Sequence, residues 1–331
     1  MLGKQIDVLA VGDITTDAFI RLKEASVHCK VNTQDCEICM PFGDKIPFEY
    51  VKVVKAVGNA ANAAVSAARL GLRSALVTNL GNDQNGKDCL NELLGNKVMT
   101  TYVKVHKGKP TNYHFVLWYE ADRTILVNHV EYEYIFPKAP APKWIYLTSL
   151  ASNTLNYHMQ IADYLEKNPN VKLAYQPGTF QMKLGFTDLK RIMDRTDLFV
   201  VNVEEAQRML ETTDRDIKVL MKKLSERGPK LVIVTDNTNG AYMFDGDHNY
   251  HITMYPDPRP AIDRTGCGDA FASTFVSALA MGKTPLEAFM WAPINPMSVA
   301  QFVGAQEGLL TKDQLEWWLK QAPPEYKPRE I

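Results

Sequence analysis

The sequence predicts an α/β fold: a mainly parallel central sheet with helices on both faces, extended by a small β-sheet lid. Short apolar runs rich in β-branched residues recur between helical patterns, an alternation typical of parallel sheets built from βαβ units. Two runs, 198–201 and 231–234, are hydrophobic throughout, as expected of strands buried on both faces. Two other stretches, 20–54 and 101–134, alternate apolar with polar residues and therefore suit antiparallel strands that form the lid.

The predicted elements follow in chain order. Strands of the parallel sheet are expected at 6–11, 74–80, 144–148, 171–175, 198–201 and 231–235. Helices are expected where alanine-rich or amphipathic stretches end near a glycine that accepts the left-handed cap, at 59–70, 83–94 and 269–281. The tail after Gln321 is rich in proline and charge and is expected to be loose.

Composition limits the classes of function. The 331 residues, 46% hydrophobic and 23% charged, are typical of a globular protein with one large domain or two ordinary ones. Lysine plus arginine number 37 against 38 aspartates plus glutamates, so a net charge of −1 offers no field to attract nucleic acid. No apolar stretch approaches the ~20 residues of a spanning helix, so a cytoplasmic protein without a membrane partner is expected.

Three of the five cysteines cluster near a histidine. Cys29, Cys36 and Cys39 lie beside His28, and the two-residue gap between Cys36 and Cys39 occurs in zinc sites and redox pairs. A zinc site requires all four groups to converge from one loop, whereas reduced thiols require nothing further. Reduced cysteines are therefore expected, and no metal is assigned here.

The segment 263–271, Asp-Arg-Thr-Gly-Cys-Gly-Asp-Ala-Phe, places two glycines and a carboxylate at the start of a helix. The unpaired amides of Gly266, Cys267 and Gly268 would hold the negative charge that develops on a transferred phosphoryl group. Asp269 would then act as the base that relieves an acceptor hydroxyl of its proton. The alternative is an aspartate that only caps the helix after a glycine-rich turn.

This segment resembles the C-terminal signature of the ribokinase-like (pfkB) family of sugar and nucleoside kinases, Asp-Thr-Thr-Gly-Ala-Gly-Asp-x-Phe. Arg264 replaces the first threonine of the pair, and Cys267 replaces the alanine. A helix N-terminus favours the thiolate, which would make Cys267 sensitive to oxidants. The simpler interpretation of Cys267 is a small side chain in a small space.

A second signature lies near the N-terminus. Gly58, Asn62, Gly71 and Gly81 match the family's glycine turn, its asparagine and two later glycines, whereas Val57 replaces the usual first glycine. Gly58 would let the chain approach a substrate closely, and the amide of Asn62 would bind neighbouring hydroxyls. The alternative for Asn62 is a polar residue that caps the helix start.

Polar residues follow two of the predicted strands. Asp17 resembles the family's early aspartate, which grips two sugar hydroxyls, and it lies where open α/β sheets place ligands. Asn202 and Glu205 resemble the Asn-x-x-Glu motif that the family ties to magnesium and phosphate. Glu205 would hold Mg²⁺ through water, as this ion commonly retains its waters.

The resemblance implies further nucleotide and cation contacts. The turn from Thr235 to Gly240 corresponds to a nucleotide-contacting turn, although its residues are unusual, and Asn295 corresponds to the adenine side. Asp263 resembles part of the K⁺-binding loops of some members. Residues 81–88, Gly-Asn-Asp-Gln-Asn-Gly-Lys-Asp, nearly form a P-loop, but the final aspartate would repel phosphates, so this stretch is interpreted as structural.

The resemblance extends from about Val8 to about Leu310 and implies a single ribokinase-like domain over residues 1–331. Its fold would be a three-layer α/β/α sandwich with a β-lid, and its activity the ATP- and Mg²⁺-dependent phosphorylation of a small sugar. A nucleoside kinase of the adenosine type is the nearest alternative, because both acceptors present ribose-like hydroxyls. A sugar or nucleotide sensor without turnover is the alternative from another class, and a homodimer through the lid strands is a further expectation.

Overall fold

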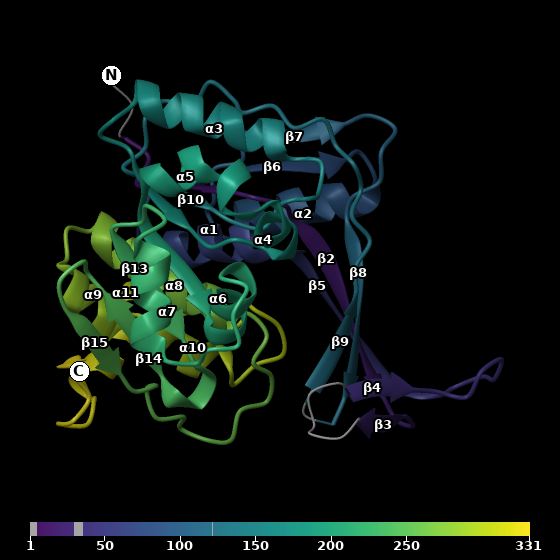
Figure 1. Ribbon diagram of the computed structural model, residues 1–331. Coiled ribbons are helices and arrows are strands. Elements are labelled where there is room, and N and C mark those ends of the chain that lie inside the picture. The colour runs from purple at the N-terminus through teal and green to yellow at the C-terminus, as the bar shows by residue number, and fades with distance from the viewer. Residues whose placement is uncertain (1–4, 30–35, 121) are drawn as a thin grey trace.

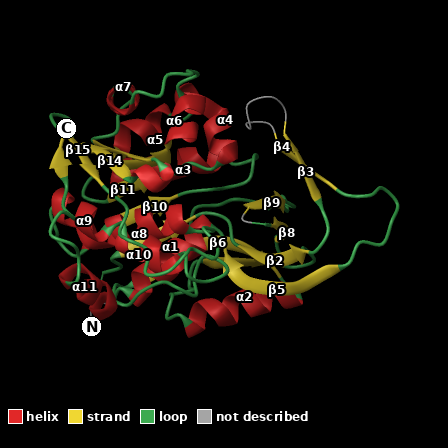
Figure 2. Cartoon of the chain, turned by 90° about the horizontal axis from the view of Figure 1, so that it is seen from below, coloured by secondary structure: helices red, strands yellow, loops and turns green. Residues whose placement is uncertain are grey.

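The computed structural model describes residues 5–29, 36–120 and 122–331. Over these residues the chain forms a ten-stranded sheet, a four-stranded sheet and a two-stranded sheet (Figure 1). Helices cover both faces of the large sheet, and the two smaller sheets project from it as an arm (Figures 1 and 2). None of the helices in the described part is both long and apolar enough to cross a bilayer.

The parallel part of the large sheet confirms the predicted strands. In spatial order its strands are β13 (Leu231–Thr235), β12 (Thr196–Asn202), β11 (Lys172–Tyr175), β10 (Trp144–Leu147), β1 (Val8–Val11), β6 (Ser74–Gly81) and β7 (Val103–His106). All neighbouring pairs in this part are parallel. Their carboxyl ends therefore meet at one edge of the sheet, where ligands of open α/β sheets bind.

Three antiparallel strands extend this sheet beyond β13. They are β14 (Ala241–Phe244), β15 (Asn249–Ile252) and β16 (Arg329–Glu330). The expectation of a loose tail was wrong, because β16 pairs with β15 and the Tyr326 hydroxyl donates a hydrogen bond to the Met290 carbonyl at 2.8 Å. The buried ring of Tyr326 anchors the tail to the core.

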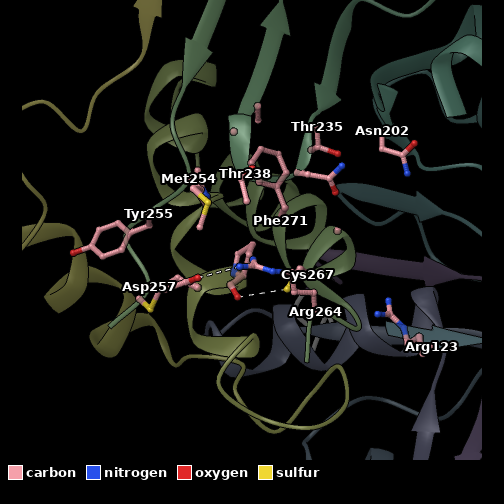
Figure 3. Close-up of a pocket in the computed structure, with 17 residues that line it drawn as sticks. Arg123, Asn202, Thr235, Thr238, Met254, Tyr255, Asp257, Arg264, Cys267 and Phe271 are labelled. Carbon is pink, nitrogen blue, oxygen red and sulfur yellow. Dashed lines mark hydrogen bonds and ion pairs between the residues drawn. The ribbon is translucent and has the colours of Figure 1, made fainter. Parts of the chain in front are cut away.

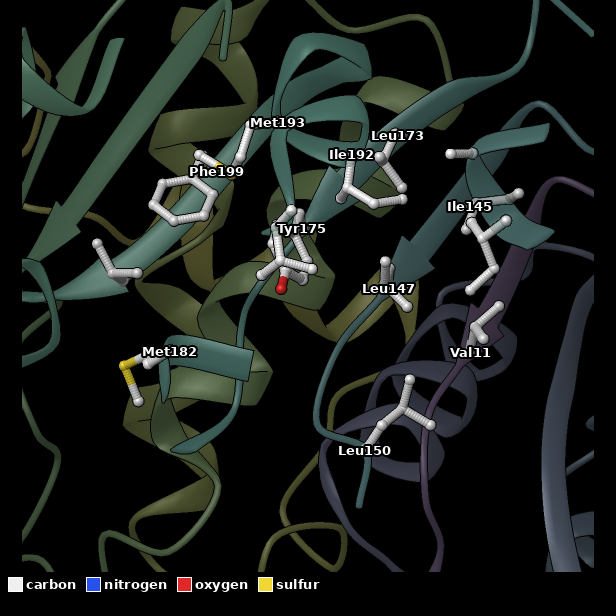
Figure 4. Packing of buried hydrophobic residues seen from close by; sticks show 14 of the residues in the cluster. Val11, Ile145, Leu147, Leu150, Leu173, Tyr175, Met182, Ile192, Met193 and Phe199 are labelled. Carbon is white, nitrogen blue, oxygen red and sulfur yellow. The ribbon is translucent and has the colours of Figure 1, made fainter. Parts of the chain in front are cut away.

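Two hydrophobic cores lie on the two sides of the sheet. In β12, Leu198 and Val200 face one core while Phe199 and Val201 face the other, which explains why this strand is apolar throughout. Figure 4 shows the core that contains Phe199, with Met193 beside it. The helices on this side are α3 (Leu155–Lys167), α4 (Thr179–Asp188), α5 (Lys190–Arg195), α6 (Val203–Met209) and α7 (Ile217–Ser225).

The opposite side of the large sheet carries a second group of helices. They are α1 (Asn59–Arg69), α8 (Cys267–Ala280), α9 (Pro285–Trp291), α10 (Ile294–Val299) and α11 (Lys312–Lys320). Helix α2 (Gln84–Gly95) packs with α1 in a third cluster. The predicted helices at 59–70, 83–94 and 269–281 are confirmed to within about two residues. Asp83 caps α2 by accepting from the Gly86 amide at 2.9 Å, so the near P-loop has a structural role here.

The lid is a four-stranded sheet in the order β5 (Phe48–Val57), β2 (Thr15–Leu22), β8 (Tyr113–Tyr119) and β9 (Asp122–Leu126). Its predicted boundaries need correction, because β7 pairs with β6 in the large sheet and β2 begins before residue 20. The pairing also differs, since β2 and β8 are parallel. The first lid strand thus comes directly from the end of β1, which places lid residues close to the sheet edge.

A hairpin of β3 (Ser26–Cys29) and β4 (Cys36–Cys39) lies at the far end of the arm (Figure 1). Cys29 and Cys36 are cross-strand partners and are joined by a disulfide, so the expectation of reduced thiols was wrong for this pair. Direct opposition across two strands brings their side chains within bonding distance. His28 contacts Ser26 at 3.1 Å, and the described residues contain no cluster of three or more metal-ligating side chains.

Candidate active site

Two cavities lie on either side of the turn that begins α8. One has a volume of about 410 Å³ and the other about 450 Å³. Cys267 and Gly268 line the first cavity, whereas Gly266 and Asp269 line the second. A single turn of four residues therefore faces both spaces, so a group bound in one can meet a group bound in the other at this turn.

Gly266 forms the turn because no other residue fits. Its φ of +79° is left-handed, and an added Cβ would collide with Ala305. The Cys267 amide donates to the Arg264 carbonyl at 3.3 Å, so it is not unpaired as the sequence suggested. The next amides of the first helical turn have no partner within the helix and carry the positive end of its dipole.

Asp269 is buried, with 9% of its surface exposed. Burial raises the pKa of Asp269 to about 6, although the hydrogen bond from Asn62 opposes this shift. The Asn62 side-chain nitrogen donates to Oδ2 at 2.8 Å, and the Gln176 side-chain nitrogen lies 3.5 Å from Oδ1. A carboxylate with this pKa is largely ionised at neutral pH and is still basic enough to accept a proton.

Asn62 orients Asp269 and does not cap its helix. The N-cap of α1 is Gly58, and Asn62 uses its amide oxygen to accept from Gln306 at 2.9 Å. Gln306 also donates to the Ala56 carbonyl at 2.7 Å, and the Tyr146 hydroxyl donates to Gln176. Side chains from four distant segments therefore fix the position of the carboxylate.

Cys267 keeps its proton in this setting. Burial raises the pKa of the Cys267 thiol to about 12, and the sulfur donates to the Pro296 carbonyl at 3.6 Å. The helix N-terminus would favour a thiolate, but the loss of solvent outweighs it. The expected reactivity of Cys267 is therefore not supported.

The second cavity contains the residues predicted for the acceptor. Asp17, Gly58 and Asn62 all line it, and Gly58 has a φ of +103°, with the Asp13 carbonyl only 2.8 Å from where a Cβ would lie. The lid contributes two residues that the sequence analysis did not identify, His114 and His129. Neither histidine lies in a motif, and only the pairing of the lid strands brings them here.

A buried carboxyl group, Asp13, lies behind this cavity. The Tyr134 hydroxyl donates to both of its oxygens at 2.8 and 2.9 Å, and the Ala151 amide donates at 2.8 Å. Burial raises the pKa of Asp13 to about 7. Its position directly after β1 was visible in the sequence, but its contacts with residues 134 and 151 were not.

The first cavity contains most of the residues predicted for the nucleotide. Asn202, Thr235 and Gly240 line it, together with an apolar group seen in Figure 3 that includes Met254 and Phe271. Asn295 does not line the cavity. Its side chain is fully buried, donates to Thr274 at 2.9 Å and accepts from the Leu310 amide at 2.9 Å, which is a structural position.

Two arginines line the same cavity from different directions. Arg264 comes from the loop before α8 and pairs with Asp257 at 3.2 Å, and Arg123 comes from lid strand β9 (Figure 3). Arg123 lies 3.8 Å from Asp263. The sequence analysis assigned neither arginine a role in binding, and the motif position of Arg264 was its only available signal.

Asp263, which the resemblance ties to a monovalent cation, accepts hydrogen bonds from two loops. One oxygen accepts from the Thr265 amide and hydroxyl at 2.9 and 2.6 Å, and the other accepts from the Gly304 amide at 2.9 Å. With Arg123 nearby, the protein itself supplies both donors and positive charge. Asp263 therefore joins the loop before α8 to the loop at Gly304, and the monovalent cation stays a prediction.

Glu205 is held beside the catalytic turn. One of its oxygens accepts from the Asn202 amide at 2.9 Å in a capping box of α6, and burial raises its pKa. Its charge also raises the pKa of Asp269. Glu205 lines neither cavity, so its role in holding Mg²⁺ through water stays a prediction.

A glycine turn with a buried base, set between two cavities, is the arrangement of a phosphotransferase that acts on a hydroxyl. The model of the pfkB family of carbohydrate kinases matches residues 51–307. The chain belongs to this family.

Two relatives differ in the acceptors they are named for. An ATP-dependent 6-phosphofructokinase of Thermoanaerobacterium thermosaccharolyticum is 25% identical, with 85% of this chain and 84% of the relative covered. A nucleoside kinase of Methanothermobacter thermautotrophicus is 26% identical, with 77% of this chain and 80% of the relative covered.

The fold is ribokinase-like, as the sequence predicted. The structure of Arabidopsis thaliana ribokinase complexed with ribose and ATP superimposes with a TM-score of 0.75, covering 95% of this chain and 98% of that one at 20% identity. The three-layer arrangement and the lid are therefore those of a known kinase fold.

Proposed function

We propose that this protein transfers the γ-phosphoryl group of ATP to a hydroxyl of a small sugar, with Asp269 as the general base. The observation that carries the proposal is the turn 266–269, which faces both cavities at once. The nucleotide would occupy the cavity with the two arginines, and the acceptor would occupy the cavity under the lid. The transferred group would pass over the start of α8, where the helix dipole favours negative charge.

On the nucleotide side, Asn202, Thr235 and Gly240 would contact ATP, and the apolar residues around Phe271 would contact its base. Arg123 and Arg264 would neutralise the phosphates, because guanidinium groups pair well with phosphate oxygens. Glu205 would hold Mg²⁺ through water, and the bound ion would supply positive charge between the phosphates. Arg123 would bring the lid into contact with the nucleotide.

On the acceptor side, Asp17 would accept hydrogen bonds from hydroxyl groups, and Gly58 would let the chain approach the sugar closely. Asn62 would keep Asp269 aimed at the reacting hydroxyl. A nucleoside is the second candidate, because Ile125, Val127 and Phe180 add an apolar side to this cavity. A free sugar would not use that side fully.

The test is ADP release from MgATP in the presence of pentoses, hexoses, keto-sugars and nucleosides. We expect at least one acceptor to stimulate release strongly, and Asp269→Asn to lower kcat by about 10³-fold. Asp194→Asn is the matched control, because Asp194 is an exposed partner of Lys190 far from the turn. Absence of stimulation by every acceptor would support a sensor instead, and a mutant as fast as the wild type would reject Asp269 as the base.

We also propose a homodimer through the outer face of the lid. Val53, Phe115 and Leu126 share that face through the register of β5, β2, β8 and β9, and each is about half exposed. Light scattering on the purified protein should give twice the chain mass, and Phe115→Glu should give one chain mass. Phe42→Glu is the control, because Phe42 is exposed but lies outside the lid sheet. A monomeric wild type at tens of micromolar would reject the dimer.

A further inference from the structure

Two histidines in the acceptor cavity have no role in the transfer chemistry described above. His114 lies on β8 and His129 lies after β9, and their rings are 5.3 Å apart. Nδ1 of His114 is 3.4 Å from Oδ1 of Asp17, and Nδ1 of His129 is 3.6 Å from Oδ2 of Asp13. The two imidazoles therefore lie between two carboxylates, with Asp17 at the wall of the cavity and Asp13 behind it.

Several polar atoms of this group are buried without a hydrogen-bond partner among the described residues. They are Oδ1 of Asp17, Nε2 of His114 and Nδ1 of His129. Buried polar atoms are nearly always paired in folded proteins, so we expect these atoms to pair with water or with an acceptor that enters the cavity. Asp17 and His114 are direct lining residues, which puts their atoms within reach of an acceptor.

The charge of the cavity wall limits which acceptor can bind. Asp17 and Asp269 line it, and no lysine or arginine lines it in the described part of the chain. Burial lowers the pKa of His129 to about 4, so its ring is neutral at neutral pH. The guanidinium groups of Arg123 and Arg264 line the other cavity. A phosphate or carboxylate on the acceptor would meet two aspartates and neither a lysine nor an arginine among the described lining residues.

An apolar part of the cavity wall lies beside the two imidazoles. The ring of Phe180 contacts His129 edge to face at 5.7 Å, and Ile125 and Val127 line the same cavity. This part of the wall suits an uncharged group with an apolar surface and a few hydrogen-bonding atoms.

We propose that His114 and His129 are specificity-determining residues that bind an uncharged part of the acceptor, and that the site rejects sugar phosphates and sugar acids. This inference rests on the proposed function and identifies the class of acceptor for the same cavity. The imidazole nitrogens of His114 and His129 hydrogen-bond to the acceptor. Asp17 holds the hydroxyl groups of the acceptor, and Asp269 takes the proton of the reacting hydroxyl. A site built to pair with these groups discriminates strongly against acceptors that lack them.

The first test compares matched acceptors on the wild-type protein. ADP release is measured for D-fructose against D-fructose 6-phosphate, D-ribose against D-ribose 5-phosphate, and D-glucose against D-gluconate, with adenosine, cytidine and uridine added. We expect the best acceptor to be uncharged, with kcat/KM at least 100-fold above that of every anionic compound. An anionic compound as the best acceptor would overturn the proposal. If nothing in the panel is phosphorylated, the proposed function fails first, which is a distinguishable result.

The second test uses His114→Leu and His129→Leu with the best acceptor. We expect KM for the acceptor to rise about tenfold or more while KM for ATP stays within twofold, since only acceptor contacts are lost. His106→Gln is the matched control, because His106 bonds to Asn79 at 2.8 Å and lines neither cavity. Unchanged acceptor KM in both leucine variants, with normal thermal melting, would show that the histidines are only structural. If a variant does not fold, the wild-type panel still decides the proposal.

Discussion

The two cavities that flank the start of α8 are nearly equal in volume but differ in charge. The cavity of about 410 Å³ is lined by Arg123 and Arg264, whereas the cavity of about 450 Å³ is lined by Asp17 and Asp269 and by two histidines. Size alone would not distinguish a nucleotide site from an acceptor site here. The arrangement of charge does, because a polyphosphate requires counter-charge and a hydroxyl that must lose a proton requires a base.

The cavities also differ in the segments that build them. Most of the acceptor cavity comes from residues before 181, including the lid, whereas most of the nucleotide cavity comes from residues after 201. Asp269 and Gly266 bring the C-terminal part to the cavity of about 450 Å³, and Arg123 brings the lid to the cavity of about 410 Å³. Gly266 and Asp269 belong to the turn that lines both cavities, so a defect in this turn should affect both.

The largest effect is expected where the cavities share structure. Gly266→Ala should lower kcat by about 10³-fold, because a Cβ would collide with Ala305 and displace the turn that stabilises the transferred charge. Steady-state kinetics with saturating ATP and acceptor would measure this loss.

Gly282→Ala is the control for backbone strain at the other end of the same helix. Gly282 also has a positive φ, +87°, but an added Cβ there would meet nothing within 4 Å. This change should cost about 1 kcal/mol of stability and leave kcat unchanged. Equal kinetic loss in both variants would mean that strain, and not the shared turn, accounts for the effect.

The next effect separates the cavities by charge. Arg123→Gln and Arg264→Gln should each raise KM for ATP about tenfold and leave KM for the acceptor nearly unchanged, because each removes a charged partner of phosphate. Arg191→Gln is the control, since Arg191 is exposed and pairs with Asp163 and Glu166. A rise only in the acceptor KM would reverse the assignment of the two cavities.

A smaller effect concerns the base. Only the ionised form of Asp269 can accept a proton, so kcat/KM for the acceptor should fall about tenfold per pH unit below a pKa of about 6 and stay level above it. The hydrogen bond from Gln176 lowers this pKa, so Gln176→Leu should move the acid limb of the profile to higher pH. A limb that stays in place or moves to lower pH would contradict the contact between Gln176 and the base.

The smallest kinetic effect is expected at Asn295, which marks the boundary of the nucleotide cavity. Asn295→Ala should leave KM for ATP unchanged but lower the stability by about 1–3 kcal/mol, because Thr274 and the Leu310 amide lose their buried partner. Thermal melting and ATP titration would separate the two outcomes. A weaker ATP interaction without loss of stability would return Asn295 to the nucleotide site.

Whether a prediction was correct depended on how far apart in the sequence the interacting residues lie. The predictions of a strand from Leu198 to Val201 and of a helix that follows the glycine turn were correct, because hydrophobic periodicity and glycine turns act within a few neighbouring residues. The strand β7 was misplaced in the lid, and β16 was taken for a loose tail. Both errors concern strands whose partners lie far away in the sequence.

By itself, the sequence determined the parallel core, the glycine turn and the presence of Asp269 beside it, since these depend on local backbone chemistry and on burial patterns along one segment. Tertiary structure alone decided that Asn62 holds Asp269, that His114 faces Asp17, and that Arg123 reaches the nucleotide cavity. It also decided the disulfide between Cys29 and Cys36. Each of these contacts depends on strand register or on the crossing of separate elements, and spacing along the chain does not encode which distant side chains will meet.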